Sequence, residues 1–416
     1  MNTISTKIKY FYSKNRLYLH CFLLFCLYLA NCFIDEITYV LYPILLVLIL
    51  LDSMTNASCY ILFNIPFCLI GQRLGVILYV ICMLSYLLRA YITIYLRDKA
   101  KPNLFILIST IVLVILCLVP FTNLNSATFI NISALVLLIL LLNLYLKKQE
   151  IFNIRLFINI LAISILCSSV LGLFYPVSQY LQTLISPFAL TENISRYSAL
   201  FPHPNSLAIL CEISLGLLAM SLLSKRDYLS ITLFCAVSLI GISTFSKTFI
   251  IIFAILIIII FVYGLTKNYK KTLIVTAILL ALGACLILIF RDLFATMFDR
   301  FFGTIGECQN FRDFINMLTT DRYDLWSEYL TEIFTNPSTF FFGKGMGAHT
   351  LHSLGAHNTF ISLLYQMGIL RLTLFAIIIG YVIYRIVKTH GYNKYVWIPI
   401  LIVALIFMIE DLLLFA

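Results

Sequence analysis

The first segment with residues that could do chemistry reads SRYSALFPHPNSLAI, residues 195–209, and ends in an apolar run. It places Arg196, His203 and Asn205 before that run. Prolines on both sides of His203 favour an extended or turned backbone, which would fix the direction of His203 and Asn205. Arg196 could hold an anion or serve as an interfacial anchor. Asn205 could contact a substrate or serve as the N-cap of the next helix.

The second segment reads GISTFSKTF, residues 241–249, and forms a break between two very apolar runs. Its only charge is Lys247. Ionisable groups at membrane depth are costly and usually face a cavity or a partner. The alternative is a lysine whose long side chain reaches the membrane surface.

The third segment contains Asp321-Arg322 and Trp326. The planar guanidinium of Arg322 suits phosphate oxygens, because it presents two parallel donors. The alternative is a surface ion pair with a neighbouring carboxylate such as Asp324.

The fourth segment, residues 342–370, opens with Gly343, Gly345 and Gly347. Glycines let the backbone approach a ligand closely. A dinucleotide fingerprint needs a preceding strand, and the sequence predicts none here. We therefore do not expect a Rossmann site.

The same segment carries His349, His352 and His357. Their spacings match no standard zinc site, and few carboxylates are nearby, so we expect no metal. His357 and Asn358 open an apolar run. Histidine is the usual general base near neutral pH, whereas Asn358 could bind substrate or cap the helix.

These candidates share one kind of position, at boundaries between loops and apolar runs. The set comprises Arg196, Lys247, Arg322 and His357. It suits an anionic, lipid-linked substrate, because cations neutralise a diphosphate as it leaves and an imidazole takes the proton of an attacking hydroxyl. No carboxylate pair of the glycosidase kind is found, so we expect transfer rather than hydrolysis.

Composition requires a membrane around these residues. Of 416 residues, 62% are hydrophobic and 11% charged, with a mean hydropathy of +1.03. Soluble proteins have about a quarter of their residues charged. The apolar runs lack strand alternation, so we expect an all-α polytopic bundle of 12 or 13 spans. The expected spans are 17–34, 38–51, 57–71, 74–96, 103–120, 128–146, 156–175, 205–224, 228–243, 247–265, 272–290, 358–387 and 395–413. The second and third are short and broken by Pro43 and Pro66.

Lys and Arg concentrate at the N-terminus and in the short links near 97–102, 147–155, 225–227, 266–271 and 388–394. This is the positive-inside pattern, so the net charge of +10 records topology and predicts no nucleic-acid partner. Alternation then places 176–204 and 291–357 outside, and the C-terminus outside or within the membrane.

The expected organisation has four parts. Residues 1–175 form N-terminal spans, 176–290 form central spans with the outer loop 176–204, 291–357 form a large outer loop, and 358–416 form C-terminal spans. The large loop is expected to be partly helical and folded. An amphipathic helix over 321–335 is predicted by Leu325, Tyr329 and Ile333, and Asn336-Pro337 would end it.

In these motifs the chain resembles the O-antigen polymerase and O-antigen ligase superfamily of bacterial envelope proteins. The similarity lies in R-x(4)-FPHPN before a helix, T-x-S-[RK] between helices, DR-x(3)-W in a long loop, and GxG followed by HN-x(2)-(I/L)-x(6)-GI. It covers roughly residues 190–375, with each motif short and all in the family's order.

The resemblance implies a GT-C-like, metal-independent and cofactor-free glycosyltransferase of the bacterial inner membrane, with its site facing the periplasm. Its substrates would be undecaprenyl-diphosphate-linked glycans in the lipid bilayer, and a chain-length regulator and a flippase would be partners. Arg322 would bind the diphosphate and His357 would activate the acceptor hydroxyl. Lys247 stands where the ligases usually carry arginine, which puts a two-pronged contact there in doubt.

We therefore expect catalysis from His357 and Arg322, and substrate binding from Arg196, His203, Asn205, Lys247 and Asn358. Arg196 and His203 match a motif seen more in polymerases, which favours a polymerase of O-antigen or a related capsule polysaccharide in lipopolysaccharide biosynthesis. The alternative in the same class is a ligase that transfers the glycan to lipid A–core. A lipid-linked oligosaccharide flippase is less favoured, because transporters place polar residues at mid-membrane and often have internal repeats.

Overall fold

The computed structural model is helical throughout its described part. The structure describes residues 2–67, 72–99, 101, 103–118, 140, 153–173, 196–201, 203–224, 227–289, 291, 295, 298, 303, 310–319, 322–345, 356, 358–389 and 395–409. No strand occurs within these ranges, which confirms the all-α expectation for them. The expected span 128–146 lies almost wholly outside them.

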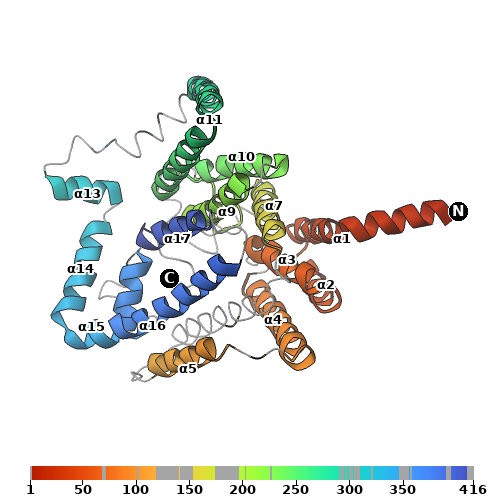
Figure 1. The fold of residues 1–416 in the computed structure, drawn as a ribbon, viewed down its shortest axis with the longest axis horizontal. Helices are drawn as coiled ribbons and strands as arrows, with labels where there is room; N and C mark the ends of the chain where they lie inside the picture. Colours follow the sequence, from red (N-terminus) through yellow and green to blue (C-terminus); the bar gives the residue numbers. More distant parts are fainter. Residues whose placement is uncertain are drawn as a thin grey trace. The chain divides into compact units, whose positions relative to one another are not determined.

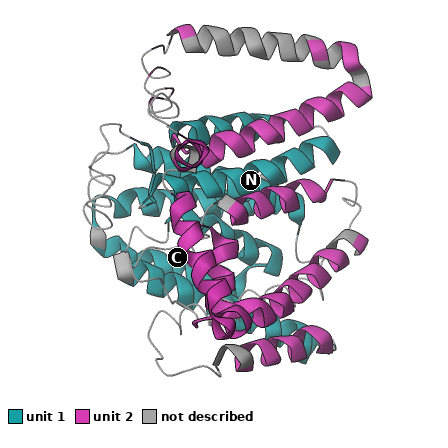
Figure 2. Cartoon of the chain, turned by 90° about the vertical axis from the view of Figure 1, so that its left-hand side faces the viewer, with its two compact units in different colours: residues 1–102, 144–244 teal, residues 103–143, 245–416 magenta. Residues whose placement is uncertain are grey.

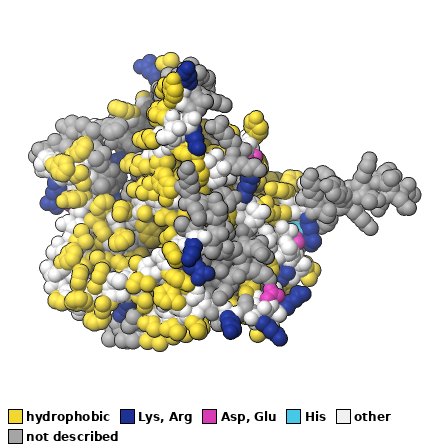
Figure 3. Space-filling model, viewed as in Figure 1, with side chains coloured by type: hydrophobic (Ala, Val, Ile, Leu, Met, Phe, Trp, Pro, Cys, Tyr) yellow, Lys and Arg dark blue, Asp and Glu magenta, His cyan; other side chains and the backbone are white. Residues whose placement is uncertain are grey.

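Five helices in the described part are long and apolar enough to cross a membrane. They cover Leu74–Arg97, Ile154–Gly172, Pro204–Ser224, Lys247–Lys267 and Thr359–Arg385. Four shorter apolar helices accompany them. Figure 3 shows broad patches of apolar side chains on the described surface of the viewed face. These features indicate a helical membrane protein.

The chain divides into two compact units, coloured separately in Figure 2. The first unit comprises residues 1–102 and 144–244. Its elements are α1 (Asn2–Asn31), η1 (Asp35–Ile37), α2 (Thr38–Leu51), α3 (Met54–Asn64), η2 (Ile65–Phe67), α4 (Gln72–Tyr91), η3 (Ile92–Arg97), α7 (Ile154–Gly172), α9 (Pro204–Ser224) and α10 (Tyr228–Ser243). Helices α7, α9 and α10 pack against one another, and α3 joins them to α2 and α4.

Small side chains allow the close packing of α7 and α9. Ser164 and Ser168 on α7 and Ser214 on α9 are fully buried. Small residues let helix backbones approach in a membrane, where no hydrophobic force drives helices together. At the end of α7, a Cβ on Gly172 would lie 2.5 Å from the Ala199 Cα. The segment that carries Arg196 therefore rests directly on α7.

The second unit comprises residues 103–143 and 245–416. Its elements are α5 (Leu104–Leu118), α11 (Lys247–Ile289), α13 (Phe311–Thr319), α14 (Arg322–Thr335), α15 (Pro337–Phe342), α16 (Thr359–Thr389) and α17 (Trp397–Ile409). Helices α14, α15 and α16 pack side by side, as Figure 1 shows, and α16 also contacts α5 and α17.

Two expected interruptions are absent from the helices that contain them. Pro43 lies inside α2, which continues to Leu51, because one missing N–H removes a single hydrogen bond. The expected link 266–271 is helical within α11, since it contains good helix formers and neither proline nor glycine. At Pro66 the α-helix does give way, to η2.

The amphipathic helix predicted over 321–335 is confirmed as α14. Tyr329 and Ile333 are buried in a small core with Ala356 and Tyr365. Asn336 follows α14, and its side-chain oxygen caps α15 by accepting from the N–H groups of Ser338 and Thr339. Helices α14 and α15 of the 291–357 loop are therefore packed against α16.

Gly343, directly after α15, packs against Gly368, where α16 is broken. Gly368 has φ of 68° and ψ of 168°, so α16 consists of two helical pieces. Gly343 also has a positive φ, of 71°. A Cβ on Gly368 would lie 2.5 Å from the Gly343 nitrogen, and a Cβ on Gly343 would lie 2.6 Å from the Gly368 nitrogen. Only glycine fits at either position.

We predict that Gly343→Ala lowers the free energy of unfolding by about 2–4 kcal/mol, through a backbone clash and a strained positive φ. Thermal denaturation of the purified protein in detergent measures the change. Gly380→Ala is the matched control, because a Cβ on Gly380 meets nothing within 4 Å. An equal effect of the two substitutions would show that the close contact between Gly343 and Gly368 does not stabilise the protein.

Candidate functional site

Arg196 holds the segment before α9 against the end of α10. Its Nε donates to the Thr244 carbonyl at 3.0 Å, and its Nη2 donates to the Asn205 side-chain oxygen at 2.7 Å. The Tyr197 N–H donates to the Ser243 carbonyl at 3.2 Å. Arg196 and Asn205, expected together from the sequence, are thus in direct contact, and Arg196 remains half-buried.

His203, rather than Asn205, precedes the first residue of α9. The helix begins at Pro204, and the His203 Nδ1 accepts from the Asn205 N–H at 3.2 Å. Proline suits the first helical position, since its fixed φ is helical and its missing N–H would be unpaired there anyway. The cap is therefore two residues earlier than the sequence suggested, and capping by Asn205 is wrong. The His203 side chain is exposed.

Lys247 is the first residue of α11. The preceding Ser246 caps the helix, because its Oγ accepts from the Phe249 N–H at 3.4 Å. Lys247 is half-buried between the buried Ser246 and Thr248. A cation at a helix N-terminus faces the positive end of the helix dipole, which is unfavourable. Helix stability thus does not account for a lysine here.

Phe245, before Ser246, adopts a left-handed φ of 49°. Bulky residues seldom adopt this conformation, and it costs about 1–2 kcal/mol. The turn that presents Lys247 is therefore held against local strain, as is common at functional sites.

Arg322 and Trp326 lie on one face of α14. Arg322 is the first residue of the helix, and residues four apart in a helix are neighbours on its surface. The Trp326 indole N–H donates to the Ala356 carbonyl at 2.8 Å. This bond fastens the arginine-bearing helix to the residue that precedes His357 in the chain.

Asp324, the expected ion-pair partner of Arg322, is bound to α13. Its Oδ1 accepts from Nη2 and Nε of Arg312 at 2.7 and 2.8 Å, and its Oδ2 accepts from Asn316 at 2.8 Å. The hydrogen bond from Arg312 holds the pKa of Asp324 below its usual range. Asp321 lies outside the described residues.

Asn358 caps α16. Its side-chain oxygen accepts from the Ile361 N–H at 3.0 Å, and its Nδ2 donates to the Met408 carbonyl at 2.6 Å. The capping role considered from the sequence is confirmed, and the amide is buried. His357 itself lies outside the described residues. So do Gly347, His349 and His352.

These contacts connect sequence candidates in two groups, neither of which includes Lys247. In the first unit, Arg196, Asn205 and His203 form one connected group. In the second unit, Trp326 connects the helix of Arg322 to the chain beside His357.

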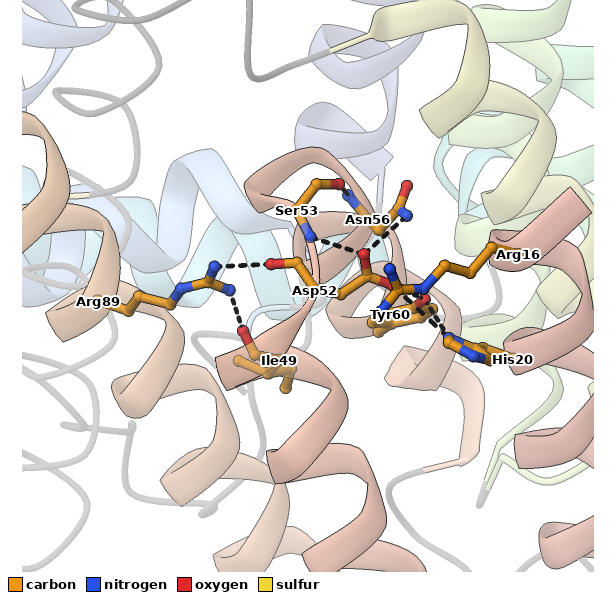
Figure 4. Close-up of polar contacts among 8 residues, drawn as sticks. All are labelled: Arg16, His20, Ile49, Asp52, Ser53, Asn56, Tyr60 and Arg89. Carbon is orange, nitrogen blue, oxygen red and sulfur yellow. Dashed lines mark hydrogen bonds and ion pairs between the residues drawn. The ribbon is translucent and has the colours of Figure 1, made fainter. Parts of the chain in front are cut away.

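A polar cluster that the sequence analysis did not identify lies among α1–α4, around the buried carboxylate of Asp52 (Figure 4). Its Oδ2 accepts from the Tyr60 hydroxyl at 2.6 Å, and its Oδ1 accepts from the Ser53 N–H at 2.7 Å. Arg16 lies at 3.3 Å and His20 at 3.6 Å from Oδ2.

Arg89 completes this cluster from α4. Its Nη2 donates to the Asp52 carbonyl at 2.6 Å, and its Nη1 donates to the Ile49 carbonyl. These contacts satisfy the last carbonyls of α2 and place a cation at the negative end of its dipole. The contacts explain the cluster as a fastening of four helices. The sequence signal was an aspartate and an arginine at the ends of apolar runs.

Two further charged residues were missed inside apolar helices. Arg371 in α16 is 4% exposed, and Glu212 in α9 is 1% exposed. Ionisable side chains within membrane helices are rare and mark functional positions by default. A search for single charges within the expected spans would have found both.

Comparisons of the chain with protein-family models, with curated proteins and with solved structures found no match.

We predict that Asp52→Ala lowers the free energy of unfolding by about 2–3 kcal/mol, because it removes the buried carboxylate that accepts from Tyr60 and Ser53 and pairs with Arg16. Chemical denaturation of the protein in detergent measures the loss. Asp98→Ala at an exposed position is the control. Comparable stability of the two variants would show that the cluster does not fasten the helices.

Proposed function

We propose that the chain is a polymerase of O-antigen or a related surface polysaccharide. It would join undecaprenyl-diphosphate-linked repeat units at the periplasmic face of a bacterial inner membrane, without a metal or cofactor. The membrane helices and the residues at their ends support this proposal.

The hydrogen bond from Trp326 to Ala356 is the observation that carries the proposal. Arg322 and Trp326 share a face of α14, and Ala356 and Asn358 flank His357 in the chain. Both flanking residues are fixed, Ala356 by Trp326 and Asn358 by its bonds to Ile361 and Met408. Because the chain on both sides of His357 is bonded within the unit that contains α14, we propose that Arg322 and His357 act on a single substrate.

The charges around α14 favour an anion near Arg322. Asp324 is the acid nearest to Arg322 in the described part of α14, and it is engaged by Arg312 and Asn316. Its negative charge is thus compensated within the protein. A diphosphate that binds Arg322 would then lie near an Asp324 carboxylate whose charge is already paired with Arg312.

The proposed reaction is a direct displacement at the donor sugar. The oxygen of an acceptor hydroxyl, on the non-reducing end of a new repeat unit, attacks the anomeric carbon of the growing chain. The new C–O bond forms as the bond from that carbon to the diphosphate oxygen breaks. Undecaprenyl diphosphate leaves with the electron pair, and Arg322 neutralises its developing charge. The hydroxyl proton passes to His357.

The remaining candidates would bind or position the substrates. Arg196 is oriented by Thr244 and Asn205, and the exposed His203 stands beside them. Lys247 would contribute charge at the start of α11. Asn358 would position the chain next to His357, since both ends of its amide are used within the protein.

We predict that Arg322→Ala lowers the rate of polymer formation about a hundredfold or more, the usual effect of removing one group that stabilises developing charge. The assay incubates purified protein in nanodiscs with lipid-linked repeat units and EDTA, and counts laddered products. Arg291→Ala is the matched control, because Arg291 is an exposed arginine of the same loop that takes no part in the contacts around Asp324 described above. His357→Ala should also abolish the ladder.

Other outcomes of the assay identify the competing functions. A strict metal requirement would contradict the mechanism. Transfer only to lipid A–core would indicate the ligase. Movement of lipid-linked units across the bilayer without any ladder would indicate a flippase.

A further inference from the structure

The short helix α15 and the glycine segment after it meet α16 well below its first residue. The Lys344 N–H donates to the Tyr365 carbonyl at 2.8 Å, and the Gly345 N–H donates to the Gln366 carbonyl at 3.0 Å. The Gly343 backbone packs against Gly368. Gly368 is the ninth residue after Thr359, so the contact lies about 14 Å along α16.

The length of α16 places this contact inside the hydrocarbon. The span Thr359–Arg385 has 27 residues and is therefore about 40 Å long, against about 30 Å of hydrocarbon. The helix is thus about 10 Å longer than the hydrocarbon is thick. Even if all of this extra length protrudes on the Thr359 side, Gly368 would lie about 4 Å inside the hydrocarbon.

The non-helical backbone of residues 343–345 has the hydrogen bonds that it would need inside the hydrocarbon. Non-helical backbone within a membrane is tolerated only where the protein satisfies its polar groups. All three N–H groups of residues 343–345 donate within the protein, since the Gly343 N–H also bonds to the Thr339 carbonyl at 2.8 Å. The N–H groups of Lys344 and Gly345 thereby bond to the two carbonyls that lose their helical partners at the break.

The side chains of this element are those of a lipid contact. Residues 336–343 carry no charge, and Phe341 and Phe342 on α15 are 46% and 52% exposed. Phe360 on the first turn of α16 is 54% exposed. The charge of Lys344 is neutralised by Glu332 at 3.0 Å. Because α15 packs along α16, its exposed rings continue the surface that this helix must present to lipid.

We propose that α15 and residues 343–345 form a re-entrant element, which enters the bilayer from the side of Thr359 and places Phe341 and Phe342 against lipid acyl chains. The proposal is independent of the enzymatic function. It places part of the 291–357 loop inside the membrane, whereas the sequence predicts the whole loop outside.

The test introduces tryptophan at Phe342 and compares quenching of the added fluorescence in vesicles of brominated and ordinary phosphatidylcholine. Ile377→Trp on α16, where Ile377 is 51% exposed, reports a lipid-facing position. Tyr323→Trp, on the first turn of α14, reports a position at the end of that helix away from α15. Tyr323 is 42% exposed. Phe341→Trp serves as a second variant should the first misfold.

We expect Phe342→Trp to lose most of its added emission in brominated lipid, as Ile377→Trp does, and to resist aqueous iodide. Quenching by iodide without quenching by brominated lipid would overturn the proposal, because the ring would then face water. Protection from both quenchers would also overturn it and would assign the face to a second copy or another protein.

Discussion

Hydrocarbon offers no partner to a backbone N–H or C=O, and this constraint governs the described structure. At the end of α2, at the start of α16 and at the break in α16, a side chain or backbone group of the same unit completes the hydrogen bonds. Arg89 takes the last carbonyls of α2, Asn358 caps α16, and the residues after Gly343 fill the break at Gly368. Each of these solutions also fixes one segment against another.

The same bonds place the residues proposed to do chemistry. Arg196 stays on the segment before α9 because it bonds to Thr244 and Asn205, so the cation is oriented by the contacts that shape the turn. Trp326 performs the equivalent task for α14. Its indole joins the helix of Arg322 to the chain beside His357, and Tyr329 and Ile333 of the same helix provide the apolar support.

Helices, helix ends and caps that depend on residues close together in the chain could be predicted from the sequence. The period of Tyr329 and Ile333 predicted α14, Asn336-Pro337 predicted its end, and Asn358 was recognised as a candidate cap. The charged ends of apolar runs predicted most helix positions, and the strong helix formers in the link 266–271 were underrated against its charge.

Contacts between distant residues could not be predicted in this way. Gly343 was expected to approach a ligand and nothing was expected of Gly368, because nothing local in the sequence indicates that two backbones meet. The Asp52 cluster draws on α1, α2, α3 and α4, and only the fold brings these helices together. The cap before α9 shifted to His203 because the preference of proline for the first helical position outweighed the capping preference of asparagine.

The Trp326 bond to Ala356 is the central contact of the proposed site, and it can be tested directly because the chain has two tryptophans. Trp326→Phe keeps an aromatic ring and removes the donor, whereas Trp397→Phe alters a residue of α17 that is 47% exposed. The rate of polymer formation from lipid-linked repeat units should fall about tenfold or more for Trp326→Phe alone, because a small displacement of a catalytic group is costly. Equal rates for the two variants, with both folded, would contradict the claim that this bond assembles the site.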